Sequence, residues 1–231
     1  MLFKQNPDPY MPHLPNWRQP LYLHLAPLWR ALEQKLATCS GRVLDVGCGM
    51  QPYRHLIGSA MTEYVGLDRA GPLSVPTHVG SAESLPFKDE SFDVVLATQV
   101  YEHLPEPEIA IAEAVRVLSP GGRLIITVPG VWPTHEAPHD YWRFTRFGLL
   151  ALVERSSLSC QELRPLGGTW ATIGQMVALE IAPLFLLRQF VPIVNLTARA
   201  MDRLGSREEL VMNWLVDAVK PGLDNATAAI D

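Results

Sequence analysis

Residues 43–53 read Val-Leu-Asp-Val-Gly-Cys-Gly-Met-Gln-Pro-Tyr, and this stretch decides the fold. A short apolar run, typical of a buried strand, leads directly into a Gly-x-Gly turn at Gly47 and Gly49. Glycine lets such a turn adopt conformations that are closed to other residues, and it lets a ligand approach the backbone. In open parallel sheets, ligands bind beyond the carboxyl ends of the strands, near the point where the strand order reverses. The stretch therefore predicts a ligand-binding turn at the end of a buried parallel strand.

Strand and helix signals alternate on both sides of this turn. Besides the strand at 42–46, strands are predicted over residues 63–68, 77–80, 92–98, 123–128 and 161–166. Helices are predicted over residues 21–37, 106–118 and 149–156, whereas residues 209–219 fit a strand and a short helix equally well. Such alternation indicates βαβ units. We therefore predict an α/β fold: a doubly wound, Rossmann-like, mostly parallel seven-stranded sheet with helices on both faces.

The chain has 231 residues, enough for one large domain with an insertion. We divide it into an N-terminal arm and lid helix (1–38), a ligand-binding core (39–168), an apolar helical insertion or cap (169–207), and a last strand with a tail (208–231). The arm is rich in proline, which predicts an extended segment. We expect this arm to form either a lid over the site, through His13, Trp17, Tyr22 and His24, or a plain strap on the surface.

Composition excludes several classes of protein. The formal net charge is −5, from 19 Lys and Arg against 24 Asp and Glu, so the chain lacks the basic surface of a nucleic-acid binder. Three cysteines without paired spacing predict neither a disulfide framework nor a zinc knuckle. No signal peptide or spanning segment is apparent, and we expect a cytoplasmic protein.

The residues around the turn indicate the kind of ligand. A dinucleotide site requires a third glycine where this chain has Pro52. Asp45, just before the turn, would repel a pyrophosphate but suits a cationic ligand such as S-adenosylmethionine, which carries an ammonium and a sulfonium. Asp68 ends the second strand, where an acid can accept hydrogen bonds from both ribose hydroxyls. The alternatives are a capping role for Asp45 and an ordinary turn role for Asp68.

Four segments in order resemble the class I S-adenosylmethionine-dependent methyltransferases, especially the bacterial group called type 11. They are residues 43–49, 64–68, 81–95 and 118–124, and Glu102-His103-Leu104 also matches. The resemblance covers about residues 40–165. This chain departs from the pattern at Gln51, in place of a motif glycine, and at Ser81, where the family often has Asp.

The resemblance implies a role for each matching position. Gly47 and Gly49 would face the methionine portion of the cofactor, with Asp45 near its ammonium, and Asp68 would bind the ribose. Ala82 and Glu83 would lie along the adenine edge, and Gln99 would lie under the sulfonium. The complete set of expected cofactor-binding residues is Asp45, Gly47, Cys48, Gly49, Asp68, Arg69, Ser81, Ala82, Glu83 and Gln99.

The segment after the fifth predicted strand is the candidate acceptor site. Residues 131–145 are dense in His, Asp, Tyr, Trp and Arg, and similar type 11 sequences carry a related stretch here. His139 and His135 are candidate general bases, and Tyr141 is expected beside them, with Trp142, on the floor of the acceptor pocket. The alternative is that these residues brace the loop, with Arg143 paired to Asp140 or Glu136.

Residues 135–139 spell His-Glu-x-x-His, a pattern that binds zinc when it lies on a helix. Pro138 falls inside the required helical turn, and the segment follows a strand. We therefore predict no metal site.

The predicted function is methyl transfer from S-adenosylmethionine to a small-molecule or lipid- or glycan-linked acceptor, at oxygen. Alternatives are a catalytically silent S-adenosylmethionine-binding regulatory or interaction protein and a nicotinamide-dependent oxidoreductase, which Asp45 and Pro52 disfavour. The apolar segment 170–204 is a pocket roof, a homodimer interface or a surface for peripheral membrane contact; the sequence leaves these three open.

Overall fold

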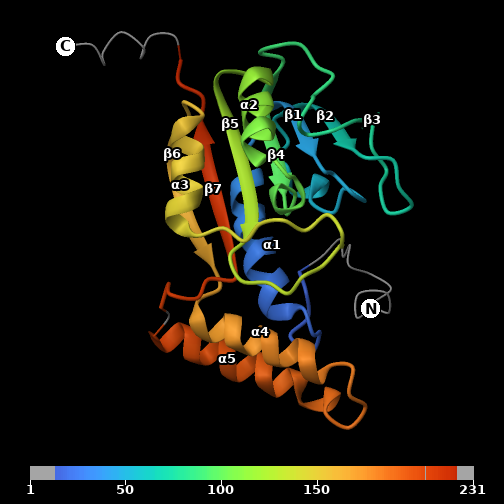
Figure 1. Ribbon diagram of the computed structural model, residues 1–231, viewed down its shortest axis with the longest axis vertical. Coiled ribbons are helices and arrows are strands. Elements are labelled where there is room, and N and C mark those ends of the chain that lie inside the picture. Colours follow the sequence, from blue (N-terminus) through green and yellow to red (C-terminus); the bar gives the residue numbers. More distant parts are fainter. Residues whose placement is uncertain (1–13, 206, 223–231) are drawn as a thin grey trace, which may run out of the picture.

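A computed structural model describes residues 14–205 and 207–222 (Figure 1). Its seven-stranded sheet has the order β3-β2-β1-β4-β5-β7-β6. The first five strands in this order are parallel, and β7 is antiparallel to both β5 and β6. The strands are β1 (Gly41–Val46), β2 (Met61–Asp68), β3 (His78–Val79), β4 (Phe92–Thr98), β5 (Leu118–Pro129), β6 (Ser159–Leu166) and β7 (Asn213–Val219). The prediction of a mostly parallel, doubly wound sheet is confirmed.

Helices cover both faces of this sheet. They are α1 (Tyr22–Leu36), α2 (Pro107–Val117), α3 (Arg146–Arg155), α4 (Thr169–Ile181) and α5 (Val191–Gly205), with three-residue 3-10 turns η2 (Arg54–Leu56), η3 (Tyr101–His103) and η4 (Arg188–Phe190). Side chains alternate along β1, so Val43 packs with α1 whereas Leu44 and Val46 pack with α2 and α3. Between β1 and β2, the only helical segment among the described residues is η2. The face on the α1 side is therefore covered by a helix that precedes the sheet in the chain.

Residues 213–219 form a strand, which decides the question that the sequence left open. β7 lies between β5 and β6, and its Asp217 is buried. Lys35 on α1 and Arg123 on β5 donate to Asp217 Oδ2 at 2.7 and 2.8 Å. Burial favours the neutral acid, but the hydrogen bonds from the two cations outweigh it and lower the pKa of Asp217. The carboxylate of Asp217 thus links α1, β5 and β7. The segment after residue 208 adds its strand to the sheet of the core. The division of the chain into four parts stays a prediction.

The apolar insertion forms the α4–α5 pair, which lies below the sheet in Figure 1. A Cβ on Gly174 of α4 would lie 2.3 Å from the Cβ of Ala198 on α5, so glycine permits this close approach. Asp202 accepts hydrogen bonds from the backbone of Gly168 and Trp170 at the start of α4. Among the described residues, none from α4 or α5 lines the cavity introduced below. The pair therefore lies beside the candidate site and does not form its roof.

The turn between α4 and α5 exposes large apolar side chains. This apolar tip comprises Leu184, Phe185, Leu186, Leu187 and Phe190, of which Phe185 is 75% and Leu186 72% exposed. No helix within the described ranges has both the length and the hydrophobicity needed to cross a membrane. The tip is thus an exposed apolar surface without a spanning segment.

The described end of the N-terminal arm packs against the α4–α5 pair. Asn195 donates to the carbonyl of Trp17 at 2.8 Å, and Gln175 donates to the carbonyl of Pro20 at 2.8 Å. These contacts fit the strap alternative for this part of the arm, while His24 faces the cavity. His13 lies outside the described residues.

Candidate active site

A cavity of about 710 Å³ lies at the carboxyl ends of β1, β2 and β4. Its wall includes residues from the segments after β1 (47–53), after β2 (68–74), after β3 (80–82), after β4 (99–104) and after β5 (132–139), and from one side of α1. Ligand pockets in proteins commonly measure roughly 300–1,000 Å³. The cavity is therefore large enough for a cofactor and lies where ligands bind in parallel α/β sheets.

The glycine turn forms the floor of this cavity. Gly47 and Gly49 have φ angles of 68° and 50°, in the left-handed region that favours glycine. A Cβ on Gly47 would lie 2.4 Å from Val100 Cγ2, so a larger residue would also displace the wall. Gln51, which replaces a family glycine, also has a positive φ, and its side chain donates to the carbonyl of Val75 at 2.7 Å. This bond links the turn to the loop after β2.

Asp68 lies beside the glycine turn and lines the cavity. Its Oδ2 accepts from the backbone N–H of Gly49 at 2.8 Å, and its Oδ1 accepts from that of Arg69 at 2.7 Å. Each carboxylate oxygen can accept more than one hydrogen bond, so lone pairs remain for two neighbouring hydroxyls. The position and orientation of Asp68 therefore suit the ribose role that the family resemblance implies.

Asp45 was expected to contact the ammonium of the cofactor, which would place it at the wall of the cavity. It is buried and is not among the described residues that line the cavity. Its Oδ2 accepts from the Tyr64 hydroxyl at 2.6 Å, whereas its Oδ1 accepts no hydrogen bond from the described residues. Burial raises the pKa of Asp45 to about 7, against the opposing effect of the Tyr64 hydrogen bond. In this structure Asp45 lies behind the turn.

The other predicted cofactor residues divide into two groups. Cys48, Arg69, Ala82 and Gln99 line the cavity. Ser81 and Glu83 do not, and the Ser81 hydroxyl accepts from the Glu83 backbone N–H at 3.2 Å. Gln99 has a φ of 55° and donates from its side chain to Thr127 Oγ1 at 3.3 Å, which holds it at the end of β4.

The loop after β5 is braced by an ion pair between a buried carboxylate, that of Asp140, and the partly exposed guanidinium of Arg143. Arg143 donates to both carboxylate oxygens of Asp140, at 2.7 and 2.8 Å, and to the carbonyls of Trp132 and Pro133. The hydrogen bonds from Arg143 lower the pKa of Asp140 well below its usual range. The structure thus shows the bracing that the sequence left as an alternative, between Arg143 and Asp140.

The loop after β5 carries the three candidate catalytic residues, which differ in whether they line the cavity. His135 and His139 both line the cavity, whereas Tyr141 does not and is 45% exposed. The Nδ1 of His139 lies 3.3 Å from the Tyr141 hydroxyl. Burial lowers the pKa of His135. Trp142, expected on the pocket floor, is also half-exposed and donates its indole N–H to the carbonyl of Leu104.

Residues 134–139 do not form a helix, so the His-Glu-x-x-His pattern does not place its histidines as in a zinc protease. His135 instead faces η3, where its ring lies 4.8 Å from that of His103.

The sequence analysis predicted no cofactor-binding or catalytic role for three residues in or beside the wall, which are His24, Glu102 and Trp132. His24 stacks on Trp132 with ring centroids 4.2 Å apart, and both line the cavity. Burial lowers the pKa of His24 to about 3, so its ring is neutral at working pH. Glu102 on η3 is fully buried, and burial raises its pKa to about 8. The Glu-His-Leu match marked η3, but no local pattern indicated that His24 and Trp132 meet.

In comparisons with known proteins, the sequence similarity to methyltransferases covers only part of the chain. Residues 44–126 match the family model of the methyltransferase domain. A probable S-adenosylmethionine-dependent methyltransferase from Mycolicibacterium smegmatis is 37% identical over 107 residues, which cover 42% of this chain and 42% of the relative. Phthiotriol/phenolphthiotriol dimycocerosates methyltransferase 1 from Mycobacterium ulcerans is 41% identical over 99 residues, covering 37% and 36%. The chain thus matches about two fifths of the length of these relatives.

The similarity of the fold extends further. A solved structure of geranyl diphosphate methyltransferase in complex with S-adenosylmethionine matches with a TM-score of 0.58 and 15% identity, covering 84% of each chain. At this identity the match supports the fold alone. The chemistry of the protein is therefore inferred from the cavity and the residues that line it.

The raised pKa of Asp45 makes a prediction about stability. A carboxyl with a pKa near its ordinary 3.8 in the unfolded state and about 7 in the folded state favours folding at low pH. That contribution is lost as the pH rises from 3.8 to 7. We expect the Asp45→Asn variant to gain at least about 2 kcal/mol of unfolding free energy relative to the wild type between pH 4 and pH 7. Urea unfolding at several pH values measures this difference.

The matched control is Asp89→Asn, because the Asp89 side chain is 72% exposed. Its difference from the wild type should vary by less than about 0.5 kcal/mol over the same range. A difference for Asp45→Asn that is constant with pH would show that Asp45 is ionised in the folded protein.

Proposed function

We propose that the protein transfers a methyl group from S-adenosylmethionine to a small-molecule or lipid- or glycan-linked acceptor, because residues 44–126 match the family model of the methyltransferase domain. The observation that carries this proposal is the position of Asp68, whose carboxylate is oriented by Gly49 and Arg69 at the wall of a cavity of about 710 Å³.

The cavity fits the cofactor in shape and chemistry. Gly47 and Gly49 carry no Cβ, so the backbone of the turn can approach a ligand closely. Asp68 can accept from the ribose hydroxyls, and Ala82 provides an apolar contact for the adenine. Gln99 and Val100 line the part between the turn and the loop after β5. In this proposal the sulfonium end lies near Gln99.

The cofactor supplies a methyl group on a sulfonium, and the acceptor atom displaces the thioether in line. The chain has to align the acceptor, exclude water and receive the acceptor proton. The loop after β5 is suited to this task because the Arg143–Asp140 pair holds it over the cavity. The acceptor would therefore lie between Gln99 and this loop.

We assign the general base to His139, with an oxygen acceptor. His139 lines the cavity, and its Nδ1 lies 3.3 Å from the Tyr141 hydroxyl, which orients the ring. Tyr141 then acts through His139, because it does not line the cavity itself. His135 is less suited, because its ring packs against His103 and burial lowers its pKa.

The apolar tip supports a lipid-linked acceptor. Phe185 and Leu186 project from a protein whose described helices cannot span a membrane. Exposed aromatic and aliphatic side chains of this kind insert into membrane interfaces. The Mycobacterium ulcerans relative, named for a lipid acceptor, agrees with this class of substrate. Peripheral membrane contact through the tip would bring the cavity to the acceptor.

Calorimetric titration tests cofactor binding. The wild type should bind S-adenosylmethionine and S-adenosylhomocysteine, but not NAD. Asp68→Ala should weaken binding of both about 100-fold, because two charge-assisted hydrogen bonds to the ribose are lost. Asp89→Ala, an exposed and distant control, should bind like the wild type. Absence of binding by folded wild-type protein would overturn the proposal, and binding without turnover on any acceptor would favour a silent regulatory protein.

Replacement of His139 tests the base. His139→Ala should lower kcat about 100-fold, because no side chain at this position then receives the acceptor proton. Affinity for the cofactor should be unchanged. His78→Ala is the control, because His78 packs on Phe87 away from the cavity. Wild-type kcat in His139→Ala would contradict the assignment.

Transfer of a labelled methyl group tests the class of acceptor. With lipid and aqueous cell extracts as substrates, label is expected in the lipid fraction. Phe185→Ser should lower transfer to vesicle-embedded acceptor about 10-fold, because an exposed Phe contributes roughly 1.5–3 kcal/mol on burial. Phe147→Ser, which replaces a 78% exposed Phe on α3, should not. Label confined to aqueous acceptors would contradict the lipid assignment, and a loss of dimer in Phe185→Ser would identify the tip as a homodimer interface.

A further inference from the structure

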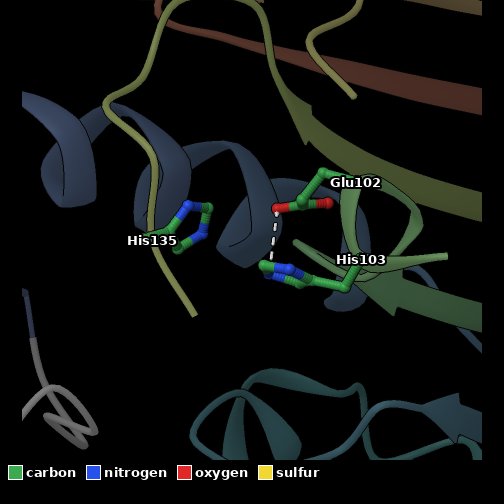
Figure 2. A group of neighbouring side chains, drawn as sticks. All are labelled: Glu102, His103 and His135. Carbon is green, nitrogen blue, oxygen red and sulfur yellow. Dashed lines mark ion pairs between the residues drawn. The ribbon is translucent and has the colours of Figure 1, made fainter. Parts of the chain in front are cut away.

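We propose that Glu102, His103 and His135 form a binding site for a divalent transition-metal ion at the wall of the cavity. Figure 2 shows Glu102 and His103 projecting from η3 toward His135 on the loop after β5. One donor atom from each residue lies within 4.8 Å of the other two. The Nε2 of His103 is 3.9 Å from Glu102 Oε1.

These distances are close to those that an ion requires. In a tetrahedral site with bonds of about 2.0–2.2 Å, donor atoms lie roughly 3.3–3.6 Å apart. Each donor would have to move by about 1 Å or less, which side-chain rotation allows. Two imidazoles and one carboxylate also form the ligand set of known catalytic zinc and non-haem iron sites.

The environment of Glu102 is an independent observation that points to a cation. The side chain is fully buried, and neither of its carboxylate oxygens accepts a hydrogen bond from the described residues. A buried carboxylate is costly unless it is paired, hydrogen-bonded or bound to a metal. Its nearest positively chargeable neighbour in this cluster is His103, at 3.9 Å. An ion among the three residues would supply the missing partner.

A hydrogen bond at its Nδ1 orients the ring of His103, and a backbone hydrogen bond to Asp140 Oδ2 at 2.9 Å holds His135. The Nδ1 of His103 lies 2.6 Å from the carbonyl oxygen of His139, which can only accept, so this nitrogen is the donor. The Nδ1 of His135 lies 3.4 Å from Asp140 Oδ2, and Arg143 holds that carboxylate in place. Metal-binding histidines typically donate one ring N–H to a carbonyl or carboxylate and bind the metal through the other nitrogen. The Nε2 of His103 is therefore its ligand atom, and His135 offers one of its two ring nitrogens.

The two segments that carry the ligands are joined by backbone hydrogen bonds. Tyr141 and Trp142 donate their N–H groups to the carbonyl of Glu102, at 2.8 and 3.2 Å. The indole N–H of Trp142 donates to Leu104 at 2.9 Å. The ligands thus lie on a preorganised frame, which reduces the entropy cost of binding.

The ligand set selects the ion. Imidazole with one carboxylate suits Zn²⁺, Fe²⁺ or Co²⁺, whereas Mg²⁺ prefers oxygen ligands and retains water. His103 and His135 line the cavity and Glu102 lies behind them, so the open coordination positions would face the acceptor. A role for the ion in holding an acceptor oxygen rests on the proposed function. The binding of the ion itself does not depend on that function. His135 becomes a ligand in this proposal, and the earlier expectation of no metal site is revised.

Metal binding is tested on protein freed of any affinity tag. Calorimetry with Zn²⁺, and Co²⁺ titration followed by visible absorption, should show one ion per chain. Glu102→Gln, His103→Ala and His135→Ala should each raise the Kd about 100-fold or more, and Asp140→Asn, which acts through His135, about 10-fold. His78→Ala should bind like the wild type.

Circular dichroism and urea unfolding establish whether each variant is folded. The Co²⁺ spectrum of the wild type gives a second readout, since a four-coordinate site absorbs more strongly than aqueous Co²⁺. The proposal is overturned if the wild type binds no ion stoichiometrically, if it binds Mg²⁺ but not Zn²⁺, or if folded Glu102→Gln and His135→Ala bind Zn²⁺ with wild-type affinity. Because no acceptor is used, these outcomes are independent of whether methyl transfer occurs.

Discussion

The hydrogen bond from the Gly49 backbone N–H to the Asp68 carboxylate joins the ends of two parallel strands, and the geometry of the cavity depends on it. It fixes the glycine turn after β1 against the first residues after β2. The turn can lie there because Gly47 and Gly49 adopt left-handed backbone conformations and because no Cβ at Gly47 meets Val100. The same hydrogen bond also fixes the Asp68 carboxylate at the wall of the cavity, so it contributes both to the architecture and to the cavity lining.

The opposite wall depends on the ion pair between Arg143 and Asp140. Arg143 bridges an otherwise irregular loop, because its guanidinium reaches one carboxylate and several backbone carbonyls together. Asp140 in turn lies against His135, and the loop hydrogen-bonds to η3 through the carbonyl of Glu102. These hydrogen bonds join the irregular loop to itself and to η3. The same loop supplies Trp132, His135 and His139 to the wall of the cavity.

The regular elements could be predicted because their patterns are local. The strand at 92–98 has the predicted bounds, and the helices around α1, α2 and α3 begin or end within a few residues of their predicted positions. Asp45 was harder to place. Its position before the glycine turn suggests a ligand contact, but the alternation of side chains along β1 directs it to the face that carries Val43, where Tyr64 binds it. The α4–α5 pair was predicted as helical, but its apolar composition does not indicate where it packs.

The sequence by itself determined the strand–turn–strand unit with Gly47, Gly49 and Asp68, because hydrophobic periodicity and glycine conformations act over a few neighbouring residues. The tertiary structure alone decided which distant side chains meet. His24 lies against Trp132, and Glu102 and His103 lie beside His135, because a helix before the sheet, a turn after β4 and a loop after β5 all reach the same edge. These contacts depend on the crossing of the chain at the carboxyl ends of parallel strands, and no local pattern of residues specifies them.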